Sequence, residues 1–308
     1  MEPLVSVIIP NYNHASYLRE RINSVLTQEF QDFEVILMDD HSTDASLEVI
    51  NNYANNPHVT RIVINEQNTG SPFEQWRKGI SMAAGKYIWI AESDDVARPQ
   101  FLDTLVNQLE NNPKAAVAFA HSCLIDQNGN KLDYGWHEGD DGRVKTCEGR
   151  RFVINRMLTS NYIYNASMAV FRKSAYEAME AMDSTYSHYH YCGDWMFWMA
   201  LCLQGDAIEV CRILNSYRQH QGQTTVQSEK TGEKWLEIGC IMKKAFGLLH
   251  LNTIQHHCLC GRLTKRFHKA SLPNRNEVLR QHADIFNRPW TDILLYEVGK
   301  NIFGFLRS

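Results

Sequence analysis

Short apolar runs alternate with amphipathic stretches over the first 120 residues. The runs LVSVII (4–9), FEVILM (33–38) and YIWIA (87–91) are continuous, which is typical of strands buried on both faces of a parallel sheet. Residues 15–28 instead carry apolar side chains at helical spacing. The same reasoning adds strands at 61–65 and 115–120 and helices at 45–53, 72–84 and 99–112. This alternation predicts a doubly wound α/β layer.

The pattern changes after residue 120. Further strands are predicted at 167–172 and 208–217, with a helix at 174–182 and an apolar helix that opens at Asp194. From residue 233 onward the pattern predicts helices only. The chain is therefore expected to form a mixed α/β domain over 1–225, with halves 1–120 and 121–225, and a helical extension over 226–308.

Carboxylates gather where two of the predicted strands end. Asp39 and Asp40 follow one strand, and Glu92, Asp94 and Asp95 follow another. Ligands of doubly wound sheets bind outside the carboxyl ends of the strands, so both loops should face one crevice. Two unit charges about 4 Å apart repel by roughly 4 kcal/mol at an effective dielectric near 20. A divalent cation would offset that repulsion, and helix capping is the competing explanation.

The composition is that of an ordinary globular protein, with 44% hydrophobic and 21% charged residues in a chain of 308. The net charge of −4, from 31 basic and 35 acidic residues, gives no general attraction to nucleic acid. The first residues, MEPLVSVIIP, lack the features of a signal peptide, and no apolar run approaches the ~20 residues of a membrane helix. We expect a cytoplasmic protein, free or at the inner face of the membrane.

Two common nucleotide-binding motifs have no match in the sequence. A dinucleotide fold needs G-x-G-x-x-G after its first strand, whereas this chain has Pro10-Asn-Tyr-Asn-His14. The P-loop pattern G-x-x-x-x-G-K-[ST] is also missing. These observations disfavour a nicotinamide-dependent dehydrogenase and a P-loop NTPase.

Several segments together resemble the inverting family-2 glycosyltransferases of the GT-A fold. They are VSVIIPNYN, EVILMDDHSTDAS, the Asn68-x-Gly70 turn, RKGISMAAGKYIWIAESDD and a later GDW, in this order over residues 4–220. The resemblance implies a GT-A, Rossmann-like mixed sheet flanked by helices. It also implies transfer of a hexosyl or N-acetylhexosaminyl group from a nucleoside diphosphate sugar, with Mn²⁺ or Mg²⁺ as cofactor.

The resemblance implies a nucleotide site as well. Asp39 matches the acid that hydrogen-bonds the base, and either Arg77 or Lys78 matches a basic side chain near the nucleotide. The positions assigned to the nucleotide are Pro10, Tyr12, Asn13, Asp39, Asn68, Lys78 and Asp94.

The metal site implied by the resemblance centres on Glu92-Ser93-Asp94, which fills the position of the D-x-D motif. Asp94 and Asp95 are the expected ligands, and Glu92 stands where the family usually has Asp. Arg218 and His220 match positions that reach the diphosphate, and His220 is a further metal candidate. The polar stretch 221–234 is expected to close over the diphosphate as a lid.

Asp194 in Cys192-Gly-Asp-Trp195 matches the general base of the family, with Gly193 where Glu is usual. Capping of the apolar helix that follows is compatible with that role. Tyr189, Tyr191 and Trp195 are acceptor-side candidates, because the C–H faces of sugars pack on aromatic rings.

These features predict a metal-dependent inverting transfer from a UDP-sugar to a glycan or lipid-linked acceptor in cell-surface polysaccharide biosynthesis, by family analogy. Residues 291–308 carry apolar side chains at helical spacing and are expected to pack on the domain, to form a homodimer, or to lie on a membrane surface. Two alternatives stay open: a sugar-phosphate nucleotidyltransferase and a non-catalytic glycan- or nucleotide-binding module.

Overall fold

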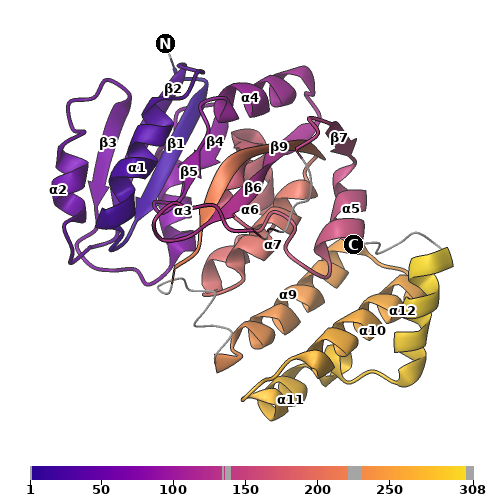
Figure 1. Ribbon diagram of the computed structural model, residues 1–308. Helices are drawn as coiled ribbons and strands as arrows, with labels where there is room; N and C mark the ends of the chain where they lie inside the picture. The colour runs from indigo at the N-terminus through magenta and orange to yellow at the C-terminus, as the bar shows by residue number, and fades with distance from the viewer. Residues whose placement is uncertain (1, 134, 136–139, 221–230, 303–308) are drawn as a thin grey trace. The chain divides into compact units, whose positions relative to one another are not determined.

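A computed structural model of the chain describes residues 2–133, 135, 140–220 and 231–302. One mixed sheet of nine strands dominates it, with the order β3-β2-β1-β4-β8-β6-β9-β5 and β7 paired to β9 (Figure 1). The strands are β1 (Val5–Asn11), β2 (Phe33–Asp39), β3 (Val59–Ile64), β4 (Tyr87–Ile90), β5 (Val96–Ala97), β6 (Ala115–Ile125), β7 (Val144–Cys147), β8 (Ala169–Arg172) and β9 (Asp206–Arg218). The mixed α/β fold predicted from the sequence is confirmed.

The α-helices lie between and after these strands. They are α1 (Ala15–Leu26), α2 (Ser46–Asn51), α3 (Pro72–Met82), α4 (Phe101–Asn111), α5 (Gly149–Phe152), α6 (Lys173–Met182), α7 (Gly193–Cys202), α9 (Lys234–Leu249), α10 (Thr253–Lys269), α11 (Arg275–Phe286) and α12 (Trp290–Ile302). None of the helices in the described part of the chain combines the length and the apolar character needed to cross a membrane.

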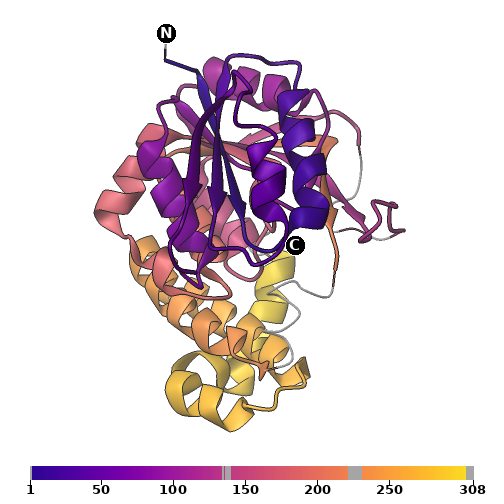
Figure 2. The ribbon, with the colours of Figure 1, turned by 90° about the vertical axis from the view of Figure 1, so that its left-hand side faces the viewer.

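The parallel half of the sheet is built from β3, β2, β1 and β4, each buried strand corresponding to one of the apolar runs. Helices α1 and α2 cover one face of these strands and α3 covers the other (Figure 2). Val7 and Leu37 join the core under α1 and α2, whereas Ile8 and Met38 face α3. At Gly79 of α3 an added Cβ would lie 2.5 Å from Ile8 Cγ2, so this helix can approach β1 only through a glycine.

The sequence reasoning treated β6 as the fifth strand of a doubly wound layer, but β8 lies between β4 and β6. It is antiparallel to both neighbours, and β6 in turn pairs with β9 in parallel. The loops that follow β1, β4 and β9 carry residues of the candidate site described below.

The chain divides into two compact units, and their boundaries differ from the expected division at 225/226. The first comprises Met1–Glu148, Asn165–His188 and Gln204–His220, and it holds the whole sheet. The second comprises Gly149–Tyr164, Tyr189–Leu203 and Gln221–Ser308. Two internal segments thus belong with the C-terminal helices, because α7 packs against α5 and α9.

Candidate functional site

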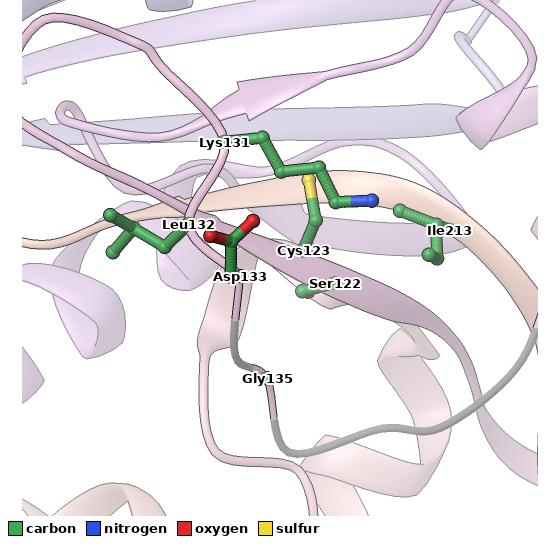
Figure 3. A pocket seen from close by; sticks show the side chains of 7 residues that line it. All are labelled: Ser122, Cys123, Lys131, Leu132, Asp133, Gly135 and Ile213. Atoms are coloured by element: carbon green, nitrogen blue, oxygen red, sulfur yellow. The ribbon is translucent and has the colours of Figure 1, made fainter.

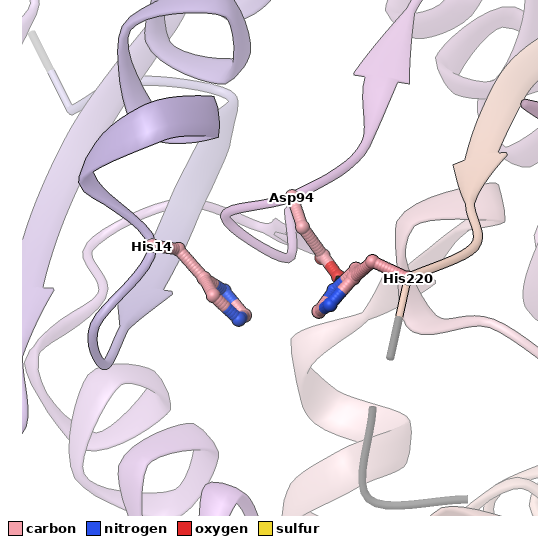
Figure 4. A group of neighbouring side chains, drawn as sticks. All are labelled: His14, Asp94 and His220. Atoms are coloured by element: carbon pink, nitrogen blue, oxygen red, sulfur yellow. Dashed lines mark hydrogen bonds and ion pairs between the residues drawn. The ribbon is translucent and has the colours of Figure 1, made fainter. Parts of the chain in front are cut away.

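Three side chains of metal-ligand type converge in the first unit. His14 follows the loop after β1, Asp94 lies in the loop after β4, and His220 follows β9. One ring nitrogen of each histidine and one carboxylate oxygen of Asp94 lie within 4.8 Å of one another (Figure 4). The Nε2 atom of His220 lies 3.0 Å from Oδ2 of Asp94, and the two imidazole centroids are 5.3 Å apart. We call His14, Asp94 and His220 the triad.

His14 is not among the site residues predicted from the sequence, because no motif around it indicates a metal ligand. Its direction is set by Asn13, which adopts a left-handed φ of 56° and accepts a hydrogen bond from the Thr43 N–H at 2.8 Å. Nδ1 of His14 lies 2.8 Å from Ser93 Oγ, beside the predicted acidic motif. The one available signal is the position of the residue, at the carboxyl end of a buried parallel strand.

The donor set of the triad fits a divalent cation. Burial, together with the charge of His220, lowers the pKa of His14 against the opposing effect of Asp94, so its imidazole stays neutral and can offer a lone pair. Burial alone would raise the pKa of Asp94, but the His220 hydrogen bond and the two imidazoles outweigh it and hold that pKa below its usual value. Two imidazole nitrogens beside one carboxylate suit Mn²⁺ better than Mg²⁺, which prefers oxygen ligands.

Glu92 lies outside the triad. The indole Nε1 of Trp76 donates to Glu92 Oε1 at 2.8 Å, and the side chain of Arg21 donates to the Glu92 carbonyl oxygen at 2.8 Å. Burial, followed by the charges of Asp94 and Asp95, raises the pKa of Glu92 to about 8. Burial and the two neighbouring carboxylates therefore disfavour a third negative charge on the acidic loop.

Asp95 is likewise not a member of the triad. Its carboxylate accepts the backbone N–H of Arg218 at 3.0 Å and Nδ2 of Asn165 at 2.7 Å. Burial, and then the charge of Asp94, raises its pKa to about 6. Protein groups thus stabilise Asp95 directly. Its predicted role as a metal ligand stays a prediction, as does that of Glu92.

A buried arginine supplies positive charge behind the acidic loop. Arg21 is fully buried and its guanidinium lies 5.3 Å from the ring centroid of Trp89. Its Nη1 and Nη2 atoms have no hydrogen-bond partner in the part of the chain that the structure describes. Burial lowers the pKa of Arg21, while Asp95, Asp94 and Glu92 act in the opposite direction. A fixed cation therefore shares this region with the carboxylates.

The side chain of Arg218 is buried, with 2% of it exposed. Its guanidinium donates to the carbonyl oxygen of Asp94 at 2.7 Å, to that of Asp126 at 3.2 Å and to the Glu20 carboxylate at 2.6 Å. It also lies 4.8 Å from the ring centroid of Tyr17. The diphosphate contact predicted for Arg218 stays a prediction. The structure adds another role, which is to hold the acidic loop against the end of β9, two residues before His220.

The predicted nucleoside residues cluster around the ends of β1 and β2. Pro10 is buried within β1, and Asn13 follows it in the loop. Asp39 is buried and accepts hydrogen bonds from Asn11 Nδ2 at 2.8 Å and Ser42 Oγ at 2.7 Å. These contacts fix the carboxylate at the carboxyl edge of the sheet.

Asn68 and Lys78 belong to a polar network around Asp40. The side chain of Asn68 donates to the Asp40 carbonyl oxygen at 3.0 Å and accepts the N–H of Gly70, whose φ of 70° closes the turn. Lys78 donates to Asn65 Oδ1 at 2.5 Å, and Asn65 in turn donates to the Asp40 carboxylate. Arg77, the alternative to Lys78, pairs with Glu180 at 2.8 Å.

Tyr12 is 46% exposed in the loop after β1, where a flat aromatic face is available to a planar base. Replacement by alanine is expected to raise the Kd for UDP by about 5- to 150-fold, since base–aromatic stacking contributes about 1–3 kcal/mol. Isothermal titration calorimetry measures the change. Tyr12→Phe is the matched control and should bind UDP as the natural protein does. Equal affinity in all three proteins would contradict the stacking role.

The second unit holds the predicted base. Asp194 lies in the first turn of α7, accepts the N–H of Trp195 at 2.8 Å and accepts Nδ2 of Asn161 at 2.8 Å. Burial, partly offset by these hydrogen bonds and reinforced by Glu237, raises its pKa to about 7. A carboxylate with this pKa can take up a proton near neutral pH.

Glu237 of α9 fixes the segment that leads into α7. Its carboxylate accepts the backbone N–H groups of His190 at 2.7 Å, Tyr191 at 2.9 Å and Cys192 at 2.8 Å. The N-terminal turn of α7, and with it Asp194, is thereby anchored to α9.

The three acceptor-side aromatics differ in accessibility. Trp195 is 5% exposed and donates to the Met157 carbonyl oxygen at 2.7 Å, as a core residue would. Tyr191 donates to Glu233 at 2.6 Å, and Tyr189 is half-buried. Their contact with an acceptor stays a prediction. The predicted lid falls largely on 221–230, outside the described residues.

Two further features of the first unit hold no predicted site residue. A cavity of about 350 Å³ is lined by Ser122, Cys123, Lys131, Leu132, Asp133, Gly135 and Ile213 (Figure 3). The other is a buried cluster in which Glu209 contacts His121 at 3.0 Å and Lys145 at 3.2 Å, beside Cys211. The lysine ammonium already balances that glutamate.

Comparison with known proteins identifies the family. The model of "Glycosyl transferase family 2" matches residues 6–179, more than half of the chain. An uncharacterised glycosyltransferase of Haemophilus influenzae is 26% identical over 72% of this chain and 68% of its own length. The glycosyltransferase GlyG of Streptococcus pneumoniae is 34% identical over 44% of each chain, and the chondroitin synthase of Pasteurella multocida is 33% identical over 47% of this chain and 15% of its own. This chain thus spans well under two thirds of several of its relatives.

Solved structures share the fold. S. aureus TarS (residues 1–349), in complex with UDP-GlcNAc, superposes with a TM-score of 0.61 at 16% identity, over 98% of this chain and 92% of that one. The mannosyltransferase PcManGT from Pyrobaculum calidifontis, in complex with GDP-Man and Mn²⁺, gives 0.56 at 15% identity, over 98% and 88%. Together with the family match and the carboxyl-edge geometry, these likenesses lead to one conclusion: the chain belongs to glycosyl transferase family 2 and has the GT-A fold.

Proposed function

We propose that this protein is a metal-dependent inverting glycosyltransferase that moves a sugar from a UDP-sugar to a hydroxyl of a glycan or lipid-linked acceptor. The observation that carries the proposal is the convergence of His14, Asp94 and His220 beside the ends of β1 and β4. Ligands of such sheets bind at this edge.

The comparisons support a nucleotide-sugar donor. TarS binds UDP-GlcNAc and PcManGT binds GDP-Man with Mn²⁺, and both have this fold. The chondroitin synthase match supports an acceptor that is a growing polysaccharide. A UDP-sugar and cell-surface polysaccharide biosynthesis are therefore our assignments for this chain.

The triad would hold the divalent cation. That cation, when bound, neutralises charge on the departing diphosphate. The chain's own residues do the rest at this edge: Tyr12 offers a face to the base, Asp39 is held ready for a hydrogen bond, and His220 is positioned through Arg218.

Asp194 would accept the proton of the acceptor hydroxyl. Inversion at the anomeric carbon needs a base that is ionised when the acceptor arrives, and a pKa of about 7 makes Asp194 ionised in about half of the molecules at neutral pH. Its hydrogen bonds to the Trp195 N–H and to Asn161 hold the carboxylate in one orientation.

Release of UDP from a panel of UDP-sugars, measured with an oligosaccharide acceptor mixture and with Mn²⁺, Mg²⁺ or EDTA, tests the proposal. We expect turnover with Mn²⁺, less with Mg²⁺ and none with EDTA. Formation of a nucleotide sugar from a sugar phosphate would instead indicate a nucleotidyltransferase. UDP binding without any turnover, across donors and acceptors, would favour a binding module.

The pH dependence of kcat/KM follows from Asp194. Because the base must be ionised, kcat/KM should rise with pH up to about 7 and then level off. Asn161 lowers this pKa by its hydrogen bond, so Asn161→Ala should move the rise to higher pH. Asn107→Ala, which removes an exposed asparagine bonded to Asp103, is the matched control and should leave the profile in place. An unmoved profile in Asn161→Ala would argue against Asp194 as the titrating base.

A further inference from the structure

The last helix, α12, turns an apolar face outward. Trp290 is 83% exposed, Leu294 63%, Val298 43% and Leu295 42%. Between Trp290 and Gly299, where exposure is described, Thr291 is the one other exposed residue. Trp290, Leu294 and Val298 recur every four residues, so they form one stripe about 12 Å long at 1.5 Å per residue.

The two acids of α12, Asp292 and Glu297, are paired with basic side chains, and α12 packs on α10, which lies beside it (Figure 1). Asp292 is 3% exposed, accepts a hydrogen bond from Arg288 at 2.6 Å and lies 3.1 Å from Nδ1 of His257. Glu297 pairs with Lys265 of α10. An ordinary surface helix buries its apolar side and exposes its polar side. In α12 four large apolar side chains are exposed, whereas Asp292 is buried.

The helix that packs on α12, α10, carries positive charge without any acidic residue. Its sequence, TIQHHCLCGRLTKRFHK, contains Arg262, Lys265, Arg266 and Lys269 and no Asp or Glu. Arg266 and Lys269 are exposed. The guanidinium of Arg262 lies 5.6 Å from the ring centroid of Tyr296 on α12, which places the basic half of α10 beside the apolar helix. Both acids of α12 are already paired.

These observations favour an anionic surface as the occupant. A second copy would bring an equally basic α10 toward this one, at a cost in charge repulsion. Four side chains, three of them about half covered, also fall short of the roughly 800 Å² per partner that a stable dimer buries. An apolar stripe that begins with a tryptophan and adjoins Lys and Arg is the composition of a helix lying in a membrane interface.

We propose that α10 and α12 dock the protein on an anionic membrane surface, with the α12 stripe in the interface and the basic end of α10 toward the headgroups. The inference goes beyond the proposed transferase activity and does not depend on it. Vesicle binding is accordingly measured without donor, acceptor or metal.

Co-sedimentation of the full chain with vesicles tests the proposal. We expect binding to vesicles with about 30% phosphatidylglycerol and little binding to pure phosphatidylcholine. Leu294→Asp should lower the partition coefficient at least about tenfold, because it places a charge in the apolar stripe. Arg266→Gln with Lys269→Gln should lower it roughly 30-fold, at about fivefold per charge removed.

The controls lie in the first unit. Met182→Asp changes an apolar residue of similar exposure, 49%, and Arg19→Gln with Arg61→Gln removes two exposed charges. Both should bind vesicles as the natural protein does, and an unchanged Tm would show that every variant is folded. Equal binding to neutral vesicles would overturn the anionic assignment. Two other results would overturn membrane docking. One is a protein that binds no vesicles and forms a concentration-dependent dimer that Leu294→Asp dissociates. The other is a Leu294→Asp variant that binds vesicles as well as Met182→Asp does.

Discussion

Asp194→Asn is expected to lower kcat by about 10²- to 10⁴-fold while the Kd for UDP changes less than about twofold. The amide keeps the shape of the side chain but cannot accept the proton of the acceptor hydroxyl. Asp194 lies in the second unit, whereas the triad lies in the first, so nucleotide binding should survive the change. Steady-state UDP release and calorimetric UDP titration measure the two effects separately.

The control for this experiment is Asp103→Asn. Asp103 is also an acid in the first turn of a helix, α4, and it is exposed. Asp103→Asn removes an exposed charge from a helix N-terminus, so it should reduce stability by about 0.3–1 kcal/mol and leave turnover unchanged. Burial disfavours the charge of Asp194 and raises its pKa, so Asp194→Asn should cost no more stability than this control. If Asp194→Asn kept full turnover, Asp194 would be a helix-capping residue and the base would have to be another group.

Asp94→Asn is expected to weaken Mn²⁺ binding at least about 100-fold, more than is typical for residues that only orient a ligand. It removes the sole carboxylate of the triad, which also lies 3.0 Å from His220 Nε2. Electron paramagnetic resonance of free Mn²⁺ gives the affinity directly, without reference to turnover. His14→Gln and His220→Gln should each weaken binding by a smaller factor, since each removes one imidazole nitrogen and leaves the carboxylate in place.

Two further variants sharpen the metal assignment. Asp32→Asn, an exposed acid before β2, should leave Mn²⁺ affinity unchanged. Glu92→Gln keeps the shape of the side chain and removes its negative charge, so a small effect on Mn²⁺ affinity would place Glu92 outside the metal site. A loss comparable to that of Asp94→Asn would instead return Glu92 to the ligand set. Unchanged Mn²⁺ affinity in Asp94→Asn would remove the triad as the metal site.

The parallel half of the fold could be predicted because its signals are local. Each of β1, β2 and β4 is a continuous apolar run, and the intervening helices show apolar residues at helical spacing. The insertion of β8 between β4 and β6 could not be predicted in this way. Strand order depends on pairing between segments about 50 to 80 residues apart, which no local pattern encodes.

Some residues of the candidate site could be predicted from the sequence and others could not. Asp94 and His220 could be predicted from motifs, and in the structure His220 Nε2 lies 3.0 Å from Asp94 Oδ2. His14 could not, because its role depends on the left-handed turn at Asn13 and on a partner far along the chain. Trp195 is a residue that the sequence suggested for acceptor binding, because it is aromatic and follows the predicted base. In the structure its side chain is buried.

Arg218 has a consequence for how this protein can vary. Its guanidinium reaches the carbonyl groups of Asp126 and Gln127, in the tight turn closed by Gly129. Turns of this kind ordinarily accept insertions, because little depends on them. Here a longer turn would withdraw two anchors from the arginine that orients the strand end before His220. Lengthening this turn is therefore expected to cost turnover before it costs stability.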